Sequence, residues 1–288
     1  MHRRTLLLGL SALAAAPVAF AAPEARTFRY AQAPHTAANL QSLDVYGARQ
    51  GAKRPILAFI HGGGWEIGDK DNAAHGARKA AAFLERGTVF ASLNYRLSPA
   101  VMHPAHVQDV AAAVAWLHDH ASEIGGDRER IYVMGHSAGA QLAALVATDE
   151  TRLGAHGLKL SVLKGAIPLD GAGYDVSFEA PIMIRRGGLL GQMYAGAFGR
   201  DGSLWADASP VSHIAAGKGI PPFLIAYTNR PSAPFQAREL ANRLTRAGVE
   251  AKTLLSPNQN HMQINHDIGK PGDMVSEAIY AALKSWGA

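Results

Sequence analysis

Short apolar runs alternate with amphipathic segments along most of the chain. The apolar runs have the length of β-strands and lie at residues 55–60, 88–95, 130–135, 163–169, 221–227 and 251–257. Between and after them, apolar residues recur with the period of one helix face at residues 72–87, 103–121, 138–150, 235–248 and 272–286. The alternation of the two periods therefore predicts strands of a central sheet connected by helices.

This order of elements favours one arrangement of the chain. Strands that alternate with helices form a mostly parallel sheet covered by helices on both faces, so the fold class is α/β. Residues 26–34 and 40–47 predict a pair of short strands at one edge. Residues 176–216, rich in Gly, Met and Arg, interrupt the rhythm and predict a lid-like insertion over the sheet. We expect residues 22–288 to form a single domain.

The first residues have the pattern of an export signal. Arg3 and Arg4 precede an apolar stretch, and the small residues Ala19 and Ala21 suit a signal peptidase. We predict a signal peptide at residues 1–21 and an exported, periplasmic or secreted protein. The arginine pair leaves both the general and the twin-arginine export routes open. The apolar stretch is short for a membrane span, so we expect no stable membrane anchor after processing.

Composition limits the classes of partner and of catalysis. The formal net charge is +5, and there is no dense stripe of Lys and Arg, so no nucleic-acid partner is expected. The chain contains no cysteine, which excludes thiolate catalysis, disulfides and cysteine-ligated zinc. The acidic residues at 200–210 fit no calcium-loop spacing, and no phosphate-binding glycine motif is present. We expect no metal and no cofactor, and the sequence does not indicate the oligomeric state.

The stretch GHSAG at residues 135–139 carries the clearest chemical signal. It fits the pattern G-x-S-x-G and lies directly after an apolar strand and directly before a helix. A sharp strand-to-helix turn of this kind needs small flanking residues and projects the serine hydroxyl at the carboxyl edge of a sheet. Ser137 is therefore the predicted nucleophile.

A second glycine-rich stretch, HGGGW at residues 61–65, follows an apolar strand. Glycines allow the backbone to approach a substrate oxygen closely, and their N–H groups can point at it without a side chain in the way. The two motifs occur in the order expected for an oxyanion loop and a nucleophile.

Together these motifs resemble those of one family. From about Leu43 onward the chain is similar to α/β hydrolases of the hormone-sensitive-lipase-like, feruloyl-esterase-like and arylformamidase-like groups, through the stretches LDVYG, HGGGWEIGDK, NYRLS, PAHVQDVAAAVAWL, GHSAGA and NHMQIN. The resemblance implies an oxyanion hole formed by the backbone N–H groups of Gly63, Gly64 and Ala138. It also implies a histidine base after the last strand; His261 is preferred, and His266 is the alternative.

The third member of the triad is ambiguous. In this fold the acid lies between the nucleophile and the histidine, at the carboxyl end of a strand. The family position usually follows the next-to-last strand, and here it falls on Asn229. Asp170 instead follows the strand at 163–169 and precedes Gly171. A carboxylate is missing at one strand end and present at the neighbouring one.

Three interpretations follow. In the favoured one, Asp170 has replaced the acid at Asn229. In the second, Asn229 orients His261 as an amide, although replacing the acid by an amide can cost a serine enzyme about 10⁴ in turnover. In the third, Asp175 serves as the acid of the triad, or the protein is a degenerate hydrolase that binds a ligand without catalysis.

The resemblance implies a serine hydrolase that cleaves a small-molecule carboxylic ester through an acyl-enzyme intermediate. An arylformamidase-like reaction on an aryl formamide is the alternative within the enzyme class. The acyl chain and the leaving group are not specified by these residues.

Overall fold

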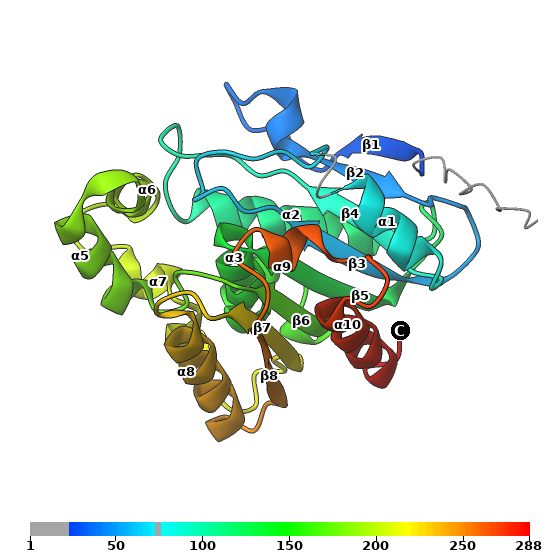
Figure 1. Cartoon of the computed structure of the whole chain (residues 1–288). Helices are drawn as coiled ribbons and strands as arrows, with labels where there is room; N and C mark the ends of the chain where they lie inside the picture. Colours follow the sequence, from blue (N-terminus) through cyan, green and yellow to red (C-terminus); the bar gives the residue numbers. More distant parts are fainter. Residues whose placement is uncertain (1–22, 73–75) are drawn as a thin grey trace, which may run out of the picture.

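A computed structural model describes residues 23–72 and 76–288 of the chain (Figure 1). The expected signal segment, residues 1–21, lies outside the described residues.

An eight-stranded sheet forms the centre of the structure, in the order β1-β2-β4-β3-β5-β6-β7-β8. Strand β2 is antiparallel to both of its neighbours, whereas the strands from β4 to β8 pair in parallel. The strands are β1 (Ala25–Arg29), β2 (Ser42–Tyr46), β3 (Arg54–Ile60), β4 (Val89–Leu93), β5 (Gly126–His136), β6 (Leu163–Leu169), β7 (Phe223–Thr228) and β8 (Ala251–Ser256). The predicted mostly parallel sheet and its antiparallel edge pair are confirmed.

Helices follow most of the parallel strands, as the sequence pattern predicts. They are α1 (Ala77–Leu84), α2 (Ala105–Asp119), α3 (Ala138–Thr148), α4 (Glu150–Gly154), α5 (Val176–Arg186), α6 (Gly188–Phe198), α7 (Trp205–Ala208), α8 (Ala233–Arg246), α9 (Gln263–His266) and α10 (Met274–Ser285). Short 3₁₀ turns occur at Ala38–Gln41, Leu160–Val162 and Pro210–His213.

Both faces of the sheet are covered, because successive side chains of a strand point to opposite faces. On β3, Ile56, Ala58 and Ile60 belong to a core that includes apolar residues of α2, α3 and α8. Leu57 and Phe59 belong to a second core formed with α1 and α10. A strand buried on both faces reads as a continuous apolar run, and this explains why 55–60 shows no polar alternation.

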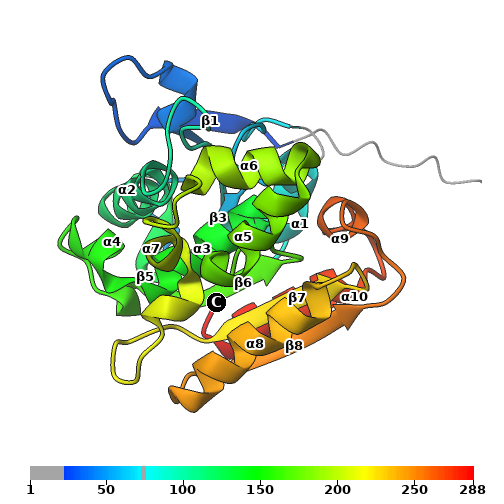
Figure 2. The ribbon, with the colours of Figure 1, turned by 90° about the vertical axis from the view of Figure 1, so that its left-hand side faces the viewer.

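The segment 176–216 contains α5, α6, α7 and one 3₁₀ turn. In Figure 1, α5 and α6 lie at the left of the molecule, and Figure 2 shows them from that side, in front of the central strands. The ring of Trp65, in the loop after β3, contacts Tyr194 and Phe198 of α6 at centroid distances of 5.4 and 4.7 Å. The segment therefore packs against the loop at the carboxyl end of β3. Within the described residues, we find no helix with both the length and the apolar character required to cross a bilayer.

Four histidines are buried in the described part of the chain; His103 pairs with Asp207, and the other three form no ion pair there. His61, His106 and His136 are each at most 3% exposed, and burial lowers the pKa of each imidazole, to about 3 for His106. All three are therefore neutral in the folded protein near neutral pH. In the unfolded chain they would bind protons below their ordinary pKa of about 6.5.

This difference predicts a pH dependence of stability. Because the unfolded state binds more protons, the free energy of unfolding should fall as the pH drops below about 6.5, by about 1.4 kcal/mol per pH unit for each such histidine. Denaturant titrations between neutral pH and pH ~5 measure this slope. His106→Gln should reduce this slope by the contribution of one histidine, about 1.4 kcal/mol per pH unit. The same change at the exposed His156 is the control, and equal slopes for both variants would contradict the interpretation.

Candidate active site

Ser137 lies at the sharp turn between β5 and α3. Its backbone has φ 55° and ψ −119°, a conformation that is strained for a residue with a side chain. A Cβ atom at Gly135 would lie 2.0 Å from the carbonyl oxygen of Gly139, and one at Gly139 would lie 2.2 Å from that of Ile60. Both flanking positions therefore require glycine, which is the physical basis of the pattern G-x-S-x-G.

Three residues from different parts of the chain form a line of hydrogen bonds at the carboxyl edge of the sheet. The Nε2 atom of His261 lies 3.1 Å from the Oγ atom of Ser137. The Nδ1 atom of His261 lies 2.6 Å from Oδ2 of Asp170. Because an ionised carboxylate only accepts, Nδ1 carries the proton and Nε2 is free to accept the serine proton. This is the geometry of an activated nucleophile.

Asp170 is fully buried and ionised. Its Oδ1 atom accepts the backbone N–H of Thr228 at 2.9 Å, and Oδ2 accepts from the Thr228 hydroxyl at 3.1 Å and from Nε of Arg230 at 3.1 Å. Burial alone would raise the pKa of this carboxyl group. The hydrogen bond to His261, the charge of Arg230 and the N–H of Thr228 outweigh burial and hold the pKa well below its usual range.

The alternative site residues lie elsewhere. Asn229 is exposed, and its amide donates to the carbonyl oxygen of Pro257 at 3.5 Å. Asp175 caps the first turn of α5 by accepting the N–H of Phe178. His266 is the last residue of α9 and is not among the partners of Ser137. The structure therefore brings Asp170, and none of these three residues, together with Ser137 and His261.

The glycine-rich loop after β3 passes directly beside Ser137. Gly63 and Gly64 have φ values of 114° and 62°, in the region that favours glycine. Ala138 follows Ser137 as the first residue of α3. Sequence reasoning missed Gly62, where a Cβ atom would lie 3.0 Å from Cβ of Ser137 and 2.9 Å from the carbonyl oxygen of His136. Its place as the first glycine of HGGGW was the available signal.

His136, directly before Ser137, was also missed. Its ring lies against that of His261 with a centroid distance of 4.6 Å, and its Nε2 atom lies 2.7 Å from the carbonyl oxygen of His261. Burial lowers the pKa of His136 well below its ordinary value, so a neutral ring donates this hydrogen bond. His136 therefore anchors the backbone of His261 beside Ser137. The variable position of G-x-S-x-G gave no hint of this contact.

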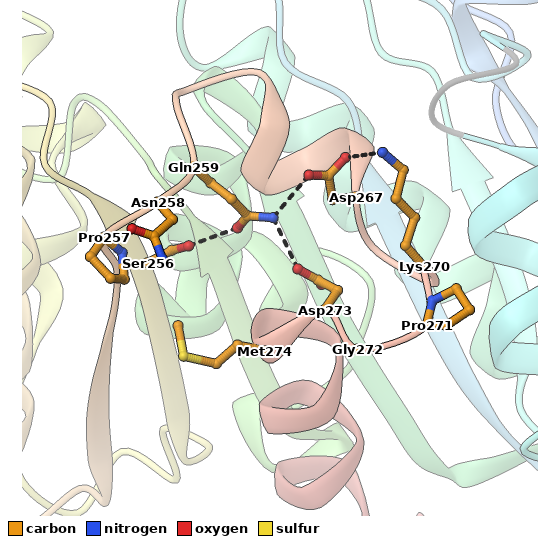
Figure 3. Close-up of a pocket in the computed structure, with 10 residues that line it drawn as sticks. All are labelled: Ser256, Pro257, Asn258, Gln259, Asp267, Lys270, Pro271, Gly272, Asp273 and Met274. Atoms are coloured by element: carbon orange, nitrogen blue, oxygen red, sulfur yellow. Dashed lines mark hydrogen bonds and ion pairs between the residues drawn. The ribbon is translucent and has the colours of Figure 1, made fainter.

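Gln259 braces the loop that carries His261. Its Oε1 atom accepts from the Ser256 hydroxyl at 2.7 Å, and its Nε2 atom donates to Asp267 at 3.2 Å and to Asp273 at 2.9 Å (Figure 3). The network joins the end of β8 to the start of α10. The pocket in Figure 3 is lined by this loop and by none of the three residues of the hydrogen-bonded line, so we assign the network a structural role.

The Gln259 network can be tested by stability. Gln259→Ala removes two hydrogen bonds to carboxylates and should lower the free energy of unfolding by about 1–3 kcal/mol. Asn258→Ala, one residue earlier in the same loop, is the matched control and should change it by less than about 0.5 kcal/mol. Equal effects of the two substitutions in denaturant titrations would contradict a bracing role for Gln259.

One group of side chains away from Ser137 has the spacing of metal ligands. Asp149, Asp207 and His213 offer ligand atoms within 4.8 Å of one another. However, Nε of Arg152 lies 2.7 Å from Asp149, and its Nη2 atom lies 2.5 Å from Asp207. The guanidinium of Arg152 already bridges the two carboxylates, so we interpret this group as an ion-pair cluster between α4 and the segment 176–216.

Comparisons with known proteins show similarity to ester hydrolases. Residues 43–162 match the family model described as BD-FAE. The chain is 34% identical over 187 residues to the probable carboxylic ester hydrolase LipM of Mycobacterium tuberculosis, covering 62% of this chain and 41% of LipM. It is 30% identical over 240 residues to a probable isoprenylcysteine alpha-carbonyl methylesterase of rice (Oryza sativa), covering 77% of this chain and 55% of the relative.

Solved structures share the fold. Esterase B from Lactobacillus rhamnosis has a TM-score of 0.71 at 21% identity, with 92% of this chain and 85% of that chain covered. A hyperthermophilic esterase from Pyrobaculum calidifontis has a TM-score of 0.68 at 24% identity, with 85% and 81% covered. The chain spans only 28% of the curated carboxylesterase NlhH of M. tuberculosis that it also matches, at 39% identity over 93 residues. The chain therefore has the α/β-hydrolase fold of these esterases and is similar in sequence to carboxylic ester hydrolases.

Proposed function

We propose that this protein hydrolyses carboxylic esters of small molecules, with Ser137 as nucleophile, His261 as base and Asp170 as acid. The observation that carries the proposal is the line of hydrogen bonds from Ser137 through His261 to Asp170, at 3.1 and 2.6 Å. The similarity to carboxylesterases supports the same reaction class.

The first half of the reaction acylates the enzyme. Ser137 Oγ attacks the ester carbonyl carbon while His261 Nε2 takes its proton, and the charge of Asp170 stabilises the imidazolium that forms. We propose that the backbone N–H groups of Gly63, Gly64 and Ala138 bind the oxyanion of the tetrahedral intermediate. Such donors are each worth about 10²–10³ in turnover. The imidazolium then protonates the departing alcohol as the C–O bond breaks.

The second half releases the acid. Water attacks the acyl-Ser137 carbonyl and gives a proton to His261, and the second tetrahedral intermediate collapses with return of that proton to the Ser137 oxygen. No metal or cofactor is required by these steps.

The walls near the oxyanion loop are apolar. A Cβ atom at Gly64 would lie 2.3 Å from Sδ of Met193, and the buried rings of Trp65, Tyr194 and Phe198 contact one another beside it. Helix α6 therefore packs against the loop, and we propose that the segment 176–216 shapes the substrate pocket. An aryl formamide, the alternative substrate class, would use the same nucleophile and oxyanion loop.

The acid assignment is tested by turnover of a short-chain nitrophenyl ester. Ser137→Ala should abolish it, and Asp170→Asn should lower kcat at least about a hundredfold, because the amide favours the wrong tautomer of His261. Asn229→Ala is the matched control and should change kcat by less than about twofold, because Asn229 is exposed and bonded to Pro257. The reverse ranking would exclude Asp170, and an inactive unaltered protein would favour a binding role.

We also propose that residues 1–21 direct export of a single domain that begins near residue 22, supported by the Arg3–Arg4 pair and the apolar stretch after it. Fractionation of expressing bacterial cells should recover protein that lacks these residues outside the cytoplasm. Protein recovered only in the cytoplasm, with residues 1–21 attached, would contradict this.

A further inference from the structure

We propose that Arg230 is a positioning residue that makes Asp170 usable as the acid of this site. The inference rests on the proposed function and deepens it. Asp170 stands where its backbone is strained and its side chain is excluded from water, and Arg230 compensates for both conditions. Arg230 acts on the reaction through Asp170 and does not itself contact Ser137 or His261 among the hydrogen bonds of the described residues.

Arg230 contacts both the side chain and the backbone at this strand end. Its Nε atom lies 3.1 Å from Oδ2 of Asp170. Its Nη2 atom lies 3.0 Å from the carbonyl oxygen of Asp170 and 2.6 Å from that of Gly171. One planar guanidinium thus holds the carboxylate and the two peptide groups that fix the direction of that carboxylate.

The backbone of Asp170 needs such support. Its φ is 43°, in the left-handed region that costs a residue with a side chain about 1–2 kcal/mol relative to the right-handed one. Its N–H donates to the carbonyl oxygen of Ala226 on β7 at 2.7 Å. The carbonyl oxygens of Asp170 and Gly171 turn toward Arg230, so the turn is held from both sides.

The side chain of Asp170 needs the support of Arg230 as well. The carboxylate is fully buried, whereas the Arg230 side chain is 26% exposed. A buried charge is costly unless it is paired and hydrogen-bonded. The carboxylate accepts from His261, Arg230 and Thr228, and of these only Arg230 carries a permanent charge.

The residues at the end of β7 donate hydrogen bonds to Asp170, whereas the usual acid position at this strand end, residue 229, carries no carboxylate. Thr228, Asn229 and Arg230 are consecutive, and the first and third of them bond Asp170 while the second points away from it. A lysine at position 230 would keep the charge but could not span the carboxylate and two carbonyl groups, since its ammonium is a compact point charge. The three contacts of Arg230 therefore favour arginine over lysine at position 230.

Other titratable groups surround the pair. His261 is contacted by Asp170 and by the ring of His136 on β5. The charge of Lys79 on α1 disfavours the protonated form of His136. The charges of Asp170 and Arg230 act in opposite directions on the ionisation of the Tyr174 hydroxyl, in the loop before α5. Arg230 is the cation among these groups that bonds Asp170. Its removal would leave the full carboxylate charge acting on the imidazolium form of His261.

The experiment compares Arg230→Ala and Arg230→Lys with Arg238→Ala, a change of the same charge at an exposed position of α8. For the nitrophenyl ester, Arg230→Ala should lower kcat about 30-fold or more and change KM by less than about threefold, as expected for a residue that acts on the reaction through Asp170. Arg230→Lys should recover only part of kcat. The acid limb of the pH profile should move to higher pH by about one unit in Arg230→Ala.

Chemical rescue separates positioning from general damage. Guanidinium chloride, well below unfolding concentrations, should raise kcat of Arg230→Ala at least about fivefold, and sodium chloride at equal ionic strength should not. Thermal melts show whether each variant is folded. If Arg230→Ala does not fold, Arg230→Lys decides the question: kcat reduced at least about fivefold at nearly unchanged KM supports positioning, and kcat equal to that of Arg238→Ala overturns it.

The two hypotheses fail differently. An active unaltered protein whose Arg230 variants match Arg238→Ala in kcat, KM and pH profile would overturn this inference alone. An unaltered protein that neither turns over the ester nor depends on Ser137 would overturn the proposed function, and the role of Arg230 with it.

Discussion

The hydrogen bond between the buried carboxylate of Asp170 and the imidazole of His261 is the interaction on which the rest of the site depends. Its length of 2.6 Å and the complete burial of Asp170 fix which nitrogen of His261 carries the proton, and therefore which nitrogen faces Ser137. A charge in such a place is stable only with several donors around it. The end of β7 provides them, through Thr228 and Arg230.

The sheet makes this convergence possible. Parallel strands end at the same edge, so Ser137 after β5, Asp170 after β6, Arg230 after β7 and His261 after β8 meet although 124 residues separate the first from the last. The loops then hold the side chains in place. His136 bonds the carbonyl oxygen of His261, and Gln259 joins the loop of His261 to the start of α10.

Sequence patterns predicted the features that neighbouring residues determine, and they missed contacts between residues far apart in the chain. The strands were recognisable because buried parallel strands read as apolar runs, and Ser137 because its turn requires glycine on both sides. The prediction at 130–135 found only part of β5, since its start at residues 126–129 is polar and irregular. Asp170 was favoured by chain order and strand position. Arg230 could not be found, because its partners lie about 60 residues earlier and depend on the pairing of β6 with β7.

The most direct test of the account is the site of covalent modification. The protein and its His261→Gln variant would be treated with a fluorophosphonate, digested, and mapped by mass spectrometry. The account predicts one rapid adduct on the peptide that contains Ser137, and at least about a hundredfold slower labelling without His261, because the serine then lacks its base. Rapid labelling of another serine, or equal rates for the two proteins, would contradict it.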